Sequence, residues 1–298
     1  MKIIRLKGGL GNQMFQYAFA MLWKRRTNEE VLLDFSSFGL LQGDKVRIPR
    51  IEKFRISLPK AQSDEIKRFS RFAYVGNSQS LIYKVLTYFE SKINNKYFME
   101  PNRAYIDPDK LSGYSFYDGY WQSYKYIDEV KDLLVQEFKP NYSLSKQTTN
   151  WIETVKSENS VFVGIRKGDY AANKKERAHY GSFGEKYYIK AMEYIENLID
   201  NPVYYIFSND IPWCKDNINF GSREIHFRDE ELQTDDFEEL IIMSSCKHAI
   251  IINSTYHWWG AELINNPDKI VVCPKKWFFD DMPINIVRPE WIQIEEED

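Results

Sequence analysis

The second half of the chain alternates between apolar runs of strand length and segments with helical periodicity, and this alternation constrains the fold most. The apolar runs are Ser160–Ile165, Val203–Phe207, Glu224–Phe227, Ala249–Ile252 and Lys269–Val272. Helical patterns lie between several of them, at Gly184–Ile199, at Asp235–Ser245 and from near Tyr256 onward. Because parallel neighbours need a crossover connection that is usually a helix, this order predicts βαβ units around a parallel sheet.

The first half is less regular but opens in the same way. We expect strands at Ile3–Leu6, Val31–Phe35 and Tyr117–Tyr124, while residues 43–105 read as helices and loops. The segment Lys139–Ser143 has the Pro, Asn and Ser content of a boundary. A chain of 298 residues has room for two medium domains. The predicted fold class is therefore α/β, with domains at residues 1–142 and 143–298, of which the second is more regular.

Composition excludes several classes of protein. The formal net charge of −3 gives no basic field for nucleic acid. The three cysteines and four histidines are widely spaced, which argues against a disulfide framework or a zinc site. No apolar stretch approaches the ~20 residues that span a bilayer, and the chain opens on a strand pattern rather than a signal peptide. We therefore expect a cytoplasmic protein without a transmembrane segment.

A glycine-rich turn lies between the first expected strand and an expected amphipathic helix. Its glycines are Gly8, Gly9 and Gly11. Glycines at such a turn let backbone N–H groups approach a ligand at the helix N-terminus, and Asn12 is a suitable capping residue. The spacing fits neither G-x-G-x-x-G nor a Walker A loop. A tight turn without a ligand therefore stays open beside a phosphate-binding turn.

Small polar or charged residues follow the strands of the second half, where ligands bind in open parallel sheets. These segments are Arg166-Lys167-Gly168-Asp169, Ser208-Asn209-Asp210 and Asn253-Ser254-Thr255. The first offers a planar guanidinium and a point charge for a diphosphate, or is a surface charge pair. The second can hold a ribose or base edge, or form a turn. The third can hold phosphate with hydroxyl and N–H groups, or cap a helix.

The run Asp107-Pro108-Asp109 has the D-x-D pattern of metal-dependent sugar transferases. It follows no clear strand pattern, and its proline suggests a turn. We therefore expect no metal site at this run, and no metal or other cofactor elsewhere in the chain.

Four motifs in order resemble the α-1,2-fucosyltransferases of glycosyltransferase family 11 over nearly the whole chain. They are the runs 8–17, 164–170, 207–210 and 253–261, the last reading Asn253-Ser254-Thr255-Tyr256-His257-Trp258-Trp259-Gly260-Ala261. The resemblance implies a GT-B-like fold of two Rossmann-type domains facing a cleft, with residues 1–142 on the acceptor side and residues 143–298 binding the donor. It implies transfer of L-fucose from GDP-fucose to a galactose hydroxyl, with inversion and without a metal.

Two motifs depart from the family pattern. The second usually reads H-x-R-R-x-D, whereas Gly164 stands in place of the histidine and Lys167 in place of the second arginine. His257 stands where the family often has serine. These departures leave open another GDP-sugar or linkage, and also a sugar-nucleotide-binding or glycan-binding protein without turnover.

The resemblance and the strand ends together define the candidate site. Arg166, Asp169 and Asn12 are the candidate catalytic residues, with Asp169 either the general base or a partner that orients Arg166, and Glu176 a second candidate base. Trp258 and Trp259 either stack on a sugar or base or belong to the core. The candidate donor-binding residues are Gly9, Gly11, Gln13, Arg166, Lys167, Ser208, Asn209, Asp210, Asn253, Ser254 and Thr255. The expected partners are GDP-fucose and a galactose-terminated glycan, and contact with a membrane would be peripheral, through a lipid-linked acceptor.

Overall fold

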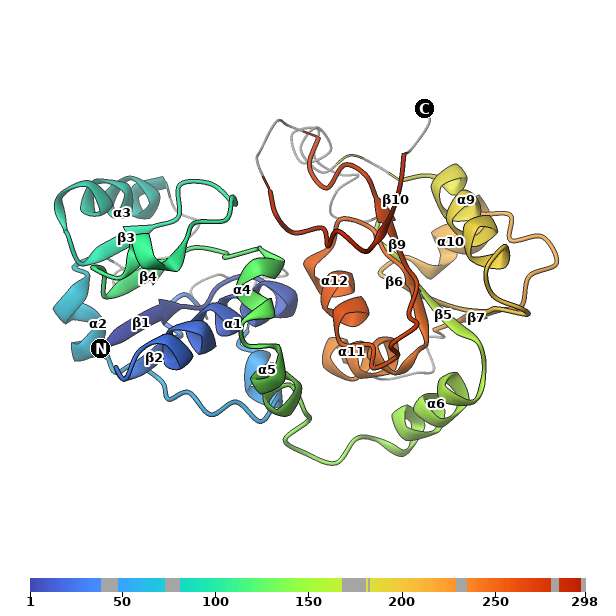
Figure 1. Cartoon of the computed structure of the whole chain (residues 1–298), viewed down its shortest axis with the longest axis horizontal. Helices are drawn as coiled ribbons and strands as arrows, with labels where there is room; N and C mark the ends of the chain where they lie inside the picture. The colour runs from blue at the N-terminus through green and yellow to red at the C-terminus, as the bar shows by residue number, and fades with distance from the viewer. Residues whose placement is uncertain are drawn as a thin grey trace. The chain divides into compact units, whose positions relative to one another are not determined.

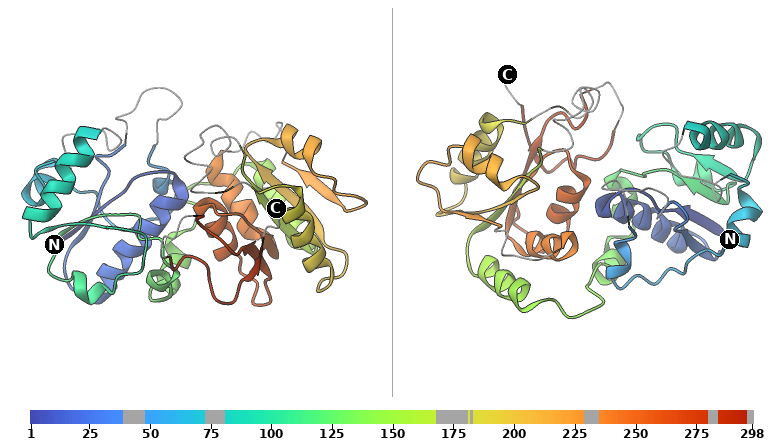
Figure 2. Two further views of the ribbon diagram at one scale, coloured as in Figure 1. Left: turned by 90° about the horizontal axis from the view of Figure 1, so that it is seen from above. Right: turned by 180° about the vertical axis from the view of Figure 1, so that it is seen from behind.

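The computed structural model describes residues 1–38, 48–72, 81–167, 181, 183–228, 235–279 and 284–295. The chain forms two compact units (Figures 1 and 2), which are Met1–Tyr142 with Pro283–Ile286, and Ser143–Met282 with Val287–Asp298. Asn285 attaches the late segment to the first unit. Its backbone oxygen accepts a hydrogen bond from the N–H of Tyr124 at 3.0 Å, and its Oδ1 accepts one from the N–H of Tyr105 at 3.2 Å.

A four-stranded parallel sheet forms the centre of the first unit, in the order β2-β1-β4-β3. Its strands are β1 (Lys2–Arg5), β2 (Val31–Asp34), β3 (Tyr97–Met99) and β4 (Phe116–Asp118). Strand β3 lies within residues 43–105, which we expected to form helices and loops, so this strand was not expected. The strand expected over Tyr117–Tyr124 was too long: it ends at Asp118, and the backbone then turns at Trp121, which has a φ of 56°.

Helices cover both faces of the first sheet. Helix α1 (Leu10–Arg26) packs with α4 (Tyr124–Asp128) and α5 (Lys131–Glu137) on one face. On the other face, α2 (Ser63–Phe69) adds Ile66 to an apolar cluster with Ile3, Leu32 and Phe116, and α3 (Leu81–Ile93) lies against β3. Two short 3-10 helices complete the unit, at Ile51–Lys53 and Pro108–Leu111.

Helix α1 was expected to be amphipathic, but it is not. It is buried on all sides from Leu10 to Trp23, apart from the partly exposed Asn12. The sheet covers one side of α1, and the helices α4 and α5 cover another. The helix therefore has no solvent-exposed polar face between Leu10 and Trp23. The buried Gln16 fits because its Oε1 accepts from the Lys7 N–H at 2.9 Å and its Nε2 donates to the Gly119 oxygen at 3.0 Å.

A six-stranded parallel sheet forms the centre of the second unit, in the order β10-β9-β8-β5-β6-β7. Its strands are β5 (Ser160–Ile165), β6 (Val203–Ser208), β7 (Ile225–Phe227), β8 (His248–Ile250), β9 (Val271–Pro274) and β10 (Ile292–Ile294). The first five confirm the predicted strands: β5 has the predicted bounds, and the ends of the other four differ by at most two residues. The sixth, β10, was not expected.

Five helices of the second unit flank this sheet (Figure 1), with α9 and α10 on one side and α11 and α12 on the other. They are α6 (Lys146–Ser157), α9 (Glu185–Glu196), α10 (Ile211–Asn217), α11 (Asp236–Ser245) and α12 (Thr255–Glu262). The predicted helices at α9, α11 and α12 are confirmed, whereas α10 was not expected. Two α/β units with parallel sheets in one chain confirm the GT-B-like fold class. In the described part of the chain, no helix is long and apolar enough to cross a bilayer.

Strand β5 is the central element of the second sheet, and its two faces differ. Val161, Val163 and Ile165 join the apolar cluster that includes α9. The alternate residues point to the opposite face, where the ring of Phe162 reaches within 3.2 Å of the position that a Cβ of Gly260 in α12 would take. Gly164, and Arg166 just beyond the strand, therefore belong to the α12 face.

Candidate functional site

Three of the predicted segments meet at the carboxyl edge of the second sheet. Strand β5 lies between β6 and β8, so the segment after it, beginning at Arg166, is flanked by Ser208–Asp210 and Asn253–Thr255. Arg166 is partly exposed. A guanidinium at this edge, beside the N-terminus of α12, is a suitable arrangement for an anionic ligand.

Lys167 takes part in the structure of this edge. Its Nζ donates a hydrogen bond to the Phe183 oxygen at 2.5 Å and lies 3.9 Å from the centre of the Trp213 ring. Its backbone N–H donates to Oδ1 of Asn209 at 3.0 Å, which ties the end of β5 to the end of β6. The ammonium is therefore engaged by a carbonyl and an aromatic face.

The residues after β6 form a helix start. Asp210 is the N-cap of α10, where its Oδ1 accepts from the Trp213 N–H at 3.0 Å. The hydroxyl of Ser208 accepts from the Asp210 N–H at 3.0 Å. These bonds are those of a turn and a cap, the alternative that sequence patterns could not separate from nucleotide binding.

The residues after β8 start helix α12. Ser254 is its N-cap and accepts from the His257 N–H at 3.5 Å, while Nδ2 of the buried Asn253 donates to the Trp277 oxygen at 2.9 Å. Thr255, the first residue of α12, is partly exposed. Of the three residues Asn253, Ser254 and Thr255, Thr255 is therefore the most exposed.

The side chain of His257 lies directly against Gly164. A Cβ on Gly164 would be 2.5 Å from both Cγ and Nδ1 of the imidazole. His257 is buried, with an exposed fraction of 5%. Burial lowers the pKa of His257 to about 3, and the charge of Arg166 adds to this effect, so the ring is neutral near pH 7.

The tryptophans of the same motif belong to the core. Trp258 and Trp259 are both fully buried, and the ring of Trp258 lies 5.4 Å from that of Trp291 and 5.9 Å from the Arg288 guanidinium. Of the two roles that the sequence left open, the structure favours core packing over stacking on a sugar or base.

The glycine turn of the first unit is built largely by its own side chains. Gly8 has a φ of 81°, and Gly9 is the N-cap of α1 without a side-chain cap. Asn12 was expected to cap this helix, but it lies within the first turn. Its Oδ1 accepts a hydrogen bond from Nε2 of Gln122 at 2.8 Å. Gly11 is buried in the same turn of the helix.

Gln13 is a structural residue of the turn. It is fully buried, and its Nε2 donates to the oxygens of Gly8 and Ile48 at 3.0 Å each. Its Oε1 accepts from the Ile51 N–H at 3.0 Å. Three backbone partners occupy the amide, so we expect Gln13 to hold the turn rather than a ligand.

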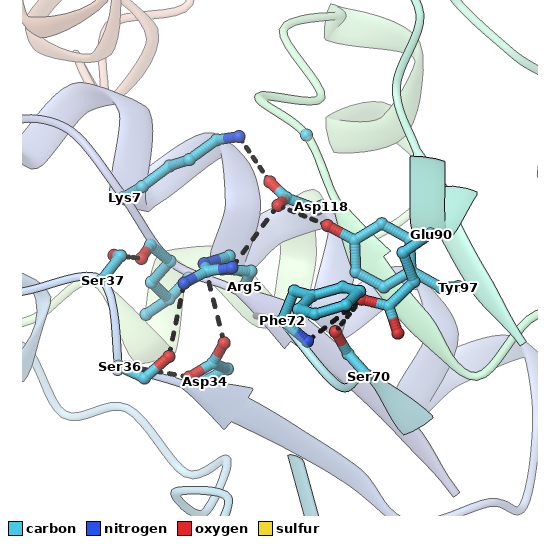
Figure 3. Close-up of polar contacts among 12 residues, drawn as sticks. Arg5, Lys7, Asp34, Ser36, Ser37, Ser70, Phe72, Glu90, Tyr97 and Asp118 are labelled. Atoms are coloured by element: carbon cyan, nitrogen blue, oxygen red, sulfur yellow. Dashed lines mark hydrogen bonds and ion pairs between the residues drawn. The ribbon is translucent and has the colours of Figure 1, made fainter. Parts of the chain in front are cut away.

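A buried ion network lies at the carboxyl edge of the first sheet (Figure 3) and was not expected from the sequence. The guanidinium of Arg5 is 3.7 Å from Asp34 and 3.6 Å from Asp118, and all three side chains are almost fully buried. Asp118 also pairs with Nζ of Lys7 and accepts from the Tyr97 hydroxyl at 2.8 Å. Burial alone would raise the pKa of Asp118, but the cations of Lys7 and Arg5 lower it to about 2.

Glu100 is a second residue that sequence reasoning missed. It follows β3, and its carboxylate accepts hydrogen bonds from the N–H groups of Tyr120, at 2.5 Å, and Trp121, at 3.2 Å. Burial raises the pKa of Glu100 to about 7, despite these bonds and the nearby charge of Lys7. The carboxylate braces the turn that contains the positive φ of Trp121, and no local sequence pattern marks such a long-range brace.

Several candidates lie elsewhere or outside the described residues. Gly168, Asp169 and Glu176 are not among the residues that the structure describes. Asp107 accepts from the Asp109 N–H at 3.0 Å, and Asp109 pairs with Arg26 at 3.0 Å, so this run is a helix cap and a surface ion pair. Within the described ranges, no group of three His, Cys, Asp or Glu side chains is arranged to hold a metal ion.

Comparison with known proteins gives matches along the whole chain. The family model described as "Glycosyl transferase family 11" matches residues 1–295. The O-antigen biosynthesis glycosyltransferase WbnK of Escherichia coli is 30% identical over 97% of this chain and 99% of its own length. The alpha-1,2-colitosyltransferase of Escherichia coli is 30% identical over 98% of each chain. The galactoside 2-alpha-L-fucosyltransferase Sec1 of Mus musculus is 24% identical over 87% of this chain and 63% of that protein.

Proposed function

The chain belongs to glycosyltransferase family 11, and from this premise we propose that it transfers L-fucose from GDP-fucose to a galactose hydroxyl of a glycan, in α-1,2 linkage and with inversion. The family match over residues 1–295 carries the proposal, because it places the whole chain, rather than one motif, in a family of sugar transferases. The two relatives at 30% identity are matched over nearly their whole length, and both are named as sugar transferases, which supports a glycosyltransferase.

In this reaction the acceptor oxygen forms a bond to the anomeric carbon, and the bond from that carbon to the diphosphate oxygen breaks. The departing GDP carries the negative charge that develops. We assign its stabilisation to Arg166 and to the N-terminus of α12 at Thr255, which lie at one edge of the second sheet. Lys167 supports this edge through Phe183 and Trp213.

The acceptor hydroxyl must lose its proton as the new bond forms. We propose Asp169, three residues after Arg166, either as the group that takes this proton or as the partner that orients Arg166. Asn12 is proposed to contact the sugars, since it is the partly exposed side chain of the first turn of α1. No metal or other cofactor has a role in this proposal.

The test is release of GDP from GDP-fucose in the presence of a small set of galactose-terminated acceptors. The wild-type protein is expected to release GDP only when an acceptor is present. Arg166→Ala is expected to lower the rate by about 10²–10³, the usual cost of losing a group that stabilises developing charge. A folded Arg166→Ala protein with full activity would contradict the assignment of Arg166.

A second candidate donor is colitose carried by the same nucleotide. The relative of 30% identity over 98% of this chain is named an alpha-1,2-colitosyltransferase, which favours this alternative. Competition between GDP-fucose and GDP-colitose for one acceptor separates the two, because the true donor has the higher kcat/KM. Tight binding of both without transfer to any acceptor would instead indicate a sugar-nucleotide-binding protein.

The comparison with relatives also suggests an acceptor and a cellular setting. The other relative at 30% identity is named for O-antigen biosynthesis, which supports an acceptor from polysaccharide biosynthesis. We propose that such an acceptor, where lipid-linked, brings the protein to the cytoplasmic face of a membrane. Sedimentation with vesicles that carry the lipid-linked saccharide, compared with plain vesicles, tests this proposal.

A further inference from the structure

Gly164 and His257 occupy one space from two distant parts of the sequence. Gly164 lies within β5, in the extended backbone of a strand, so its backbone does not demand glycine. Space demands it, because a Cβ would be 2.5 Å from Cγ and Nδ1 of His257 and 2.8 Å from Cδ2. Real side chains do not approach so closely, and the neighbour is a buried ring rather than a flexible tip. The two positions are therefore interlocked.

The imidazole held on Gly164 has an unusual environment for a structural histidine. Its Nδ1 is enclosed and has no hydrogen-bond partner among the residues that the structure describes. An enclosed polar atom without a partner is costly, so buried nitrogen atoms are normally paired. By contrast, Nδ1 of His248, which is also buried, accepts from the Ile270 N–H at 3.0 Å.

The position of His257 indicates which ligand its Nδ1 can contact. Its charged neighbour is Arg166, which depresses its pKa, and the ring stays neutral near pH 7. A neutral imidazole can donate a hydrogen bond from Nδ1 without adding a second charge to the site. The ring also lies at the start of α12, where backbone N–H groups favour anions.

Resting on the proposed function, we infer that His257 is a donor-positioning residue, which offers its Nδ1 to an oxygen of the nucleoside diphosphate that Arg166 binds. Gly164 allows the imidazole to take this position, because any larger residue would displace the ring. The two departures from the family pattern are then one exchange: a side chain absent from the strand is replaced in space by an imidazole from the helix.

The first test measures GDP binding to the full chain by calorimetry. His257→Ala is expected to weaken GDP binding about tenfold or more, the usual scale for a hydrogen bond to a charged group. His257→Asn is expected to keep most of the affinity, since its amide nitrogen reaches about the position of Nδ1. His257→Gln is expected to behave like His257→Ala, because its amide extends further. His248→Ala is the matched control, as it removes a buried histidine at the opposite end of the neighbouring strand β8 and is expected to leave GDP affinity unchanged.

The second test uses the interlock. Gly164→Ala is expected to lower the melting temperature by about 3–10 °C and to weaken GDP binding, because the new Cβ displaces the ring. In a His257→Ser background the same substitution is expected to cost little stability, because the space is free. The exchange variant with Gly164→His and His257→Ser is expected to bind GDP more tightly than His257→Ser alone.

The outcomes separate this inference from the function on which it rests. A wild-type protein that binds no GDP would overturn the proposed function and the inference together. A wild-type protein that binds GDP, with folded His257→Ala and His257→Asn variants that bind it equally well, would overturn the inference alone. A ring that only fills space would also give equal GDP affinities for His257→Ala and His257→Gln with the wild type, and would affect the melting temperature alone.

Discussion

Replacing Arg5 by methionine tests whether the first unit depends on its buried ion network. Arg5 lies at the end of β1 with its side chain fully buried, and its guanidinium faces Asp34 at 3.7 Å and Asp118 at 3.6 Å. Methionine keeps much of the length and volume of the side chain but removes its charge. Two buried carboxylates then lose a shared cation, although Asp118 retains Lys7.

Removing one partner of a buried ion pair costs about 3–5 kcal/mol, since the remaining charge has neither water nor a counter-ion. The segment Met1–Tyr142 makes up nearly all of the first unit. With an unfolding entropy of about 2.1 cal/mol/K per residue, this loss lowers the melting temperature of that unit by about 10–17 °C.

The loss should depend on pH in a defined direction. Burial raises the pKa of Asp34 above its ordinary value, against the pull of Arg5, and without Arg5 the pKa rises further. Between the ordinary and the folded pKa, the folded state binds a proton that the unfolded state has released, so stability falls as the pH rises through this window. The deficit of Arg5→Met should therefore be smaller at pH 4 than at pH 8.

The assay is differential scanning calorimetry of the full chain at several pH values. Arg25→Met is the matched control, because Arg25 pairs with Asp132 at an exposed site of the same unit, and this substitution should leave the melting temperature nearly unchanged. Adding Asp34→Asn to Arg5→Met should recover part of the loss. Equal stability of Arg5→Met and Arg25→Met, or a deficit that grows as the pH falls, would refute the reasoning.

Three further predictions follow from single contacts. Gly8→Ala should cost about 1–2 kcal/mol in denaturant unfolding, because Gly8 has a φ of 81°, whereas Gly9→Ala, with open space around it, should cost less than about 0.5 kcal/mol. Glu262→Gln should destabilise the second unit by about 3–5 kcal/mol, since Glu262 forms a buried two-pronged pair with Arg288 at 2.5 and 2.7 Å, and a loss under about 1 kcal/mol would contradict this. Glu100→Gln should gain stability relative to the wild type as the pH rises from about 4.5 to about 7, because the folded state binds a proton there that the unfolded state has lost; a difference that is flat over this range would argue against a raised pKa.

Local periodicity predicted the elements that are long or repeat in a regular order. The strands β5 and β6 and the helices α9 and α11 each contain enough residues for an apolar pattern to emerge above noise. Strands β3 and β10 lie outside the regular alternation of strands and helices and were not predicted. The expected amphipathicity of α1 was wrong for a different reason, because neighbours cover the helix on several sides and these neighbours come from distant parts of the chain.

The candidate site divides in the same way. Parallel strand order alone predicts that Arg166, Ser208–Asp210 and Asn253–Thr255 share one edge, because carboxyl ends of parallel strands meet there. It does not tell which of these polar groups are already used. Asp210 and Ser254 cap helices, and Gln13 is bonded to the backbone, which only the completed fold reveals.

The sequence by itself determined the α/β class, the parallel order of the second half, the edge at which polar residues gather and the family to which the chain belongs. These features depend on patterns among neighbouring residues or on motifs in a fixed order. The tertiary structure alone decided that Arg5 joins Asp34 and Asp118, that Glu100 braces the turn at Trp121, and that His257 occupies the space above Gly164. Such pairings join residues that lie far apart in the sequence, and their energies come from burial and excluded volume, which exist only once the chain has folded.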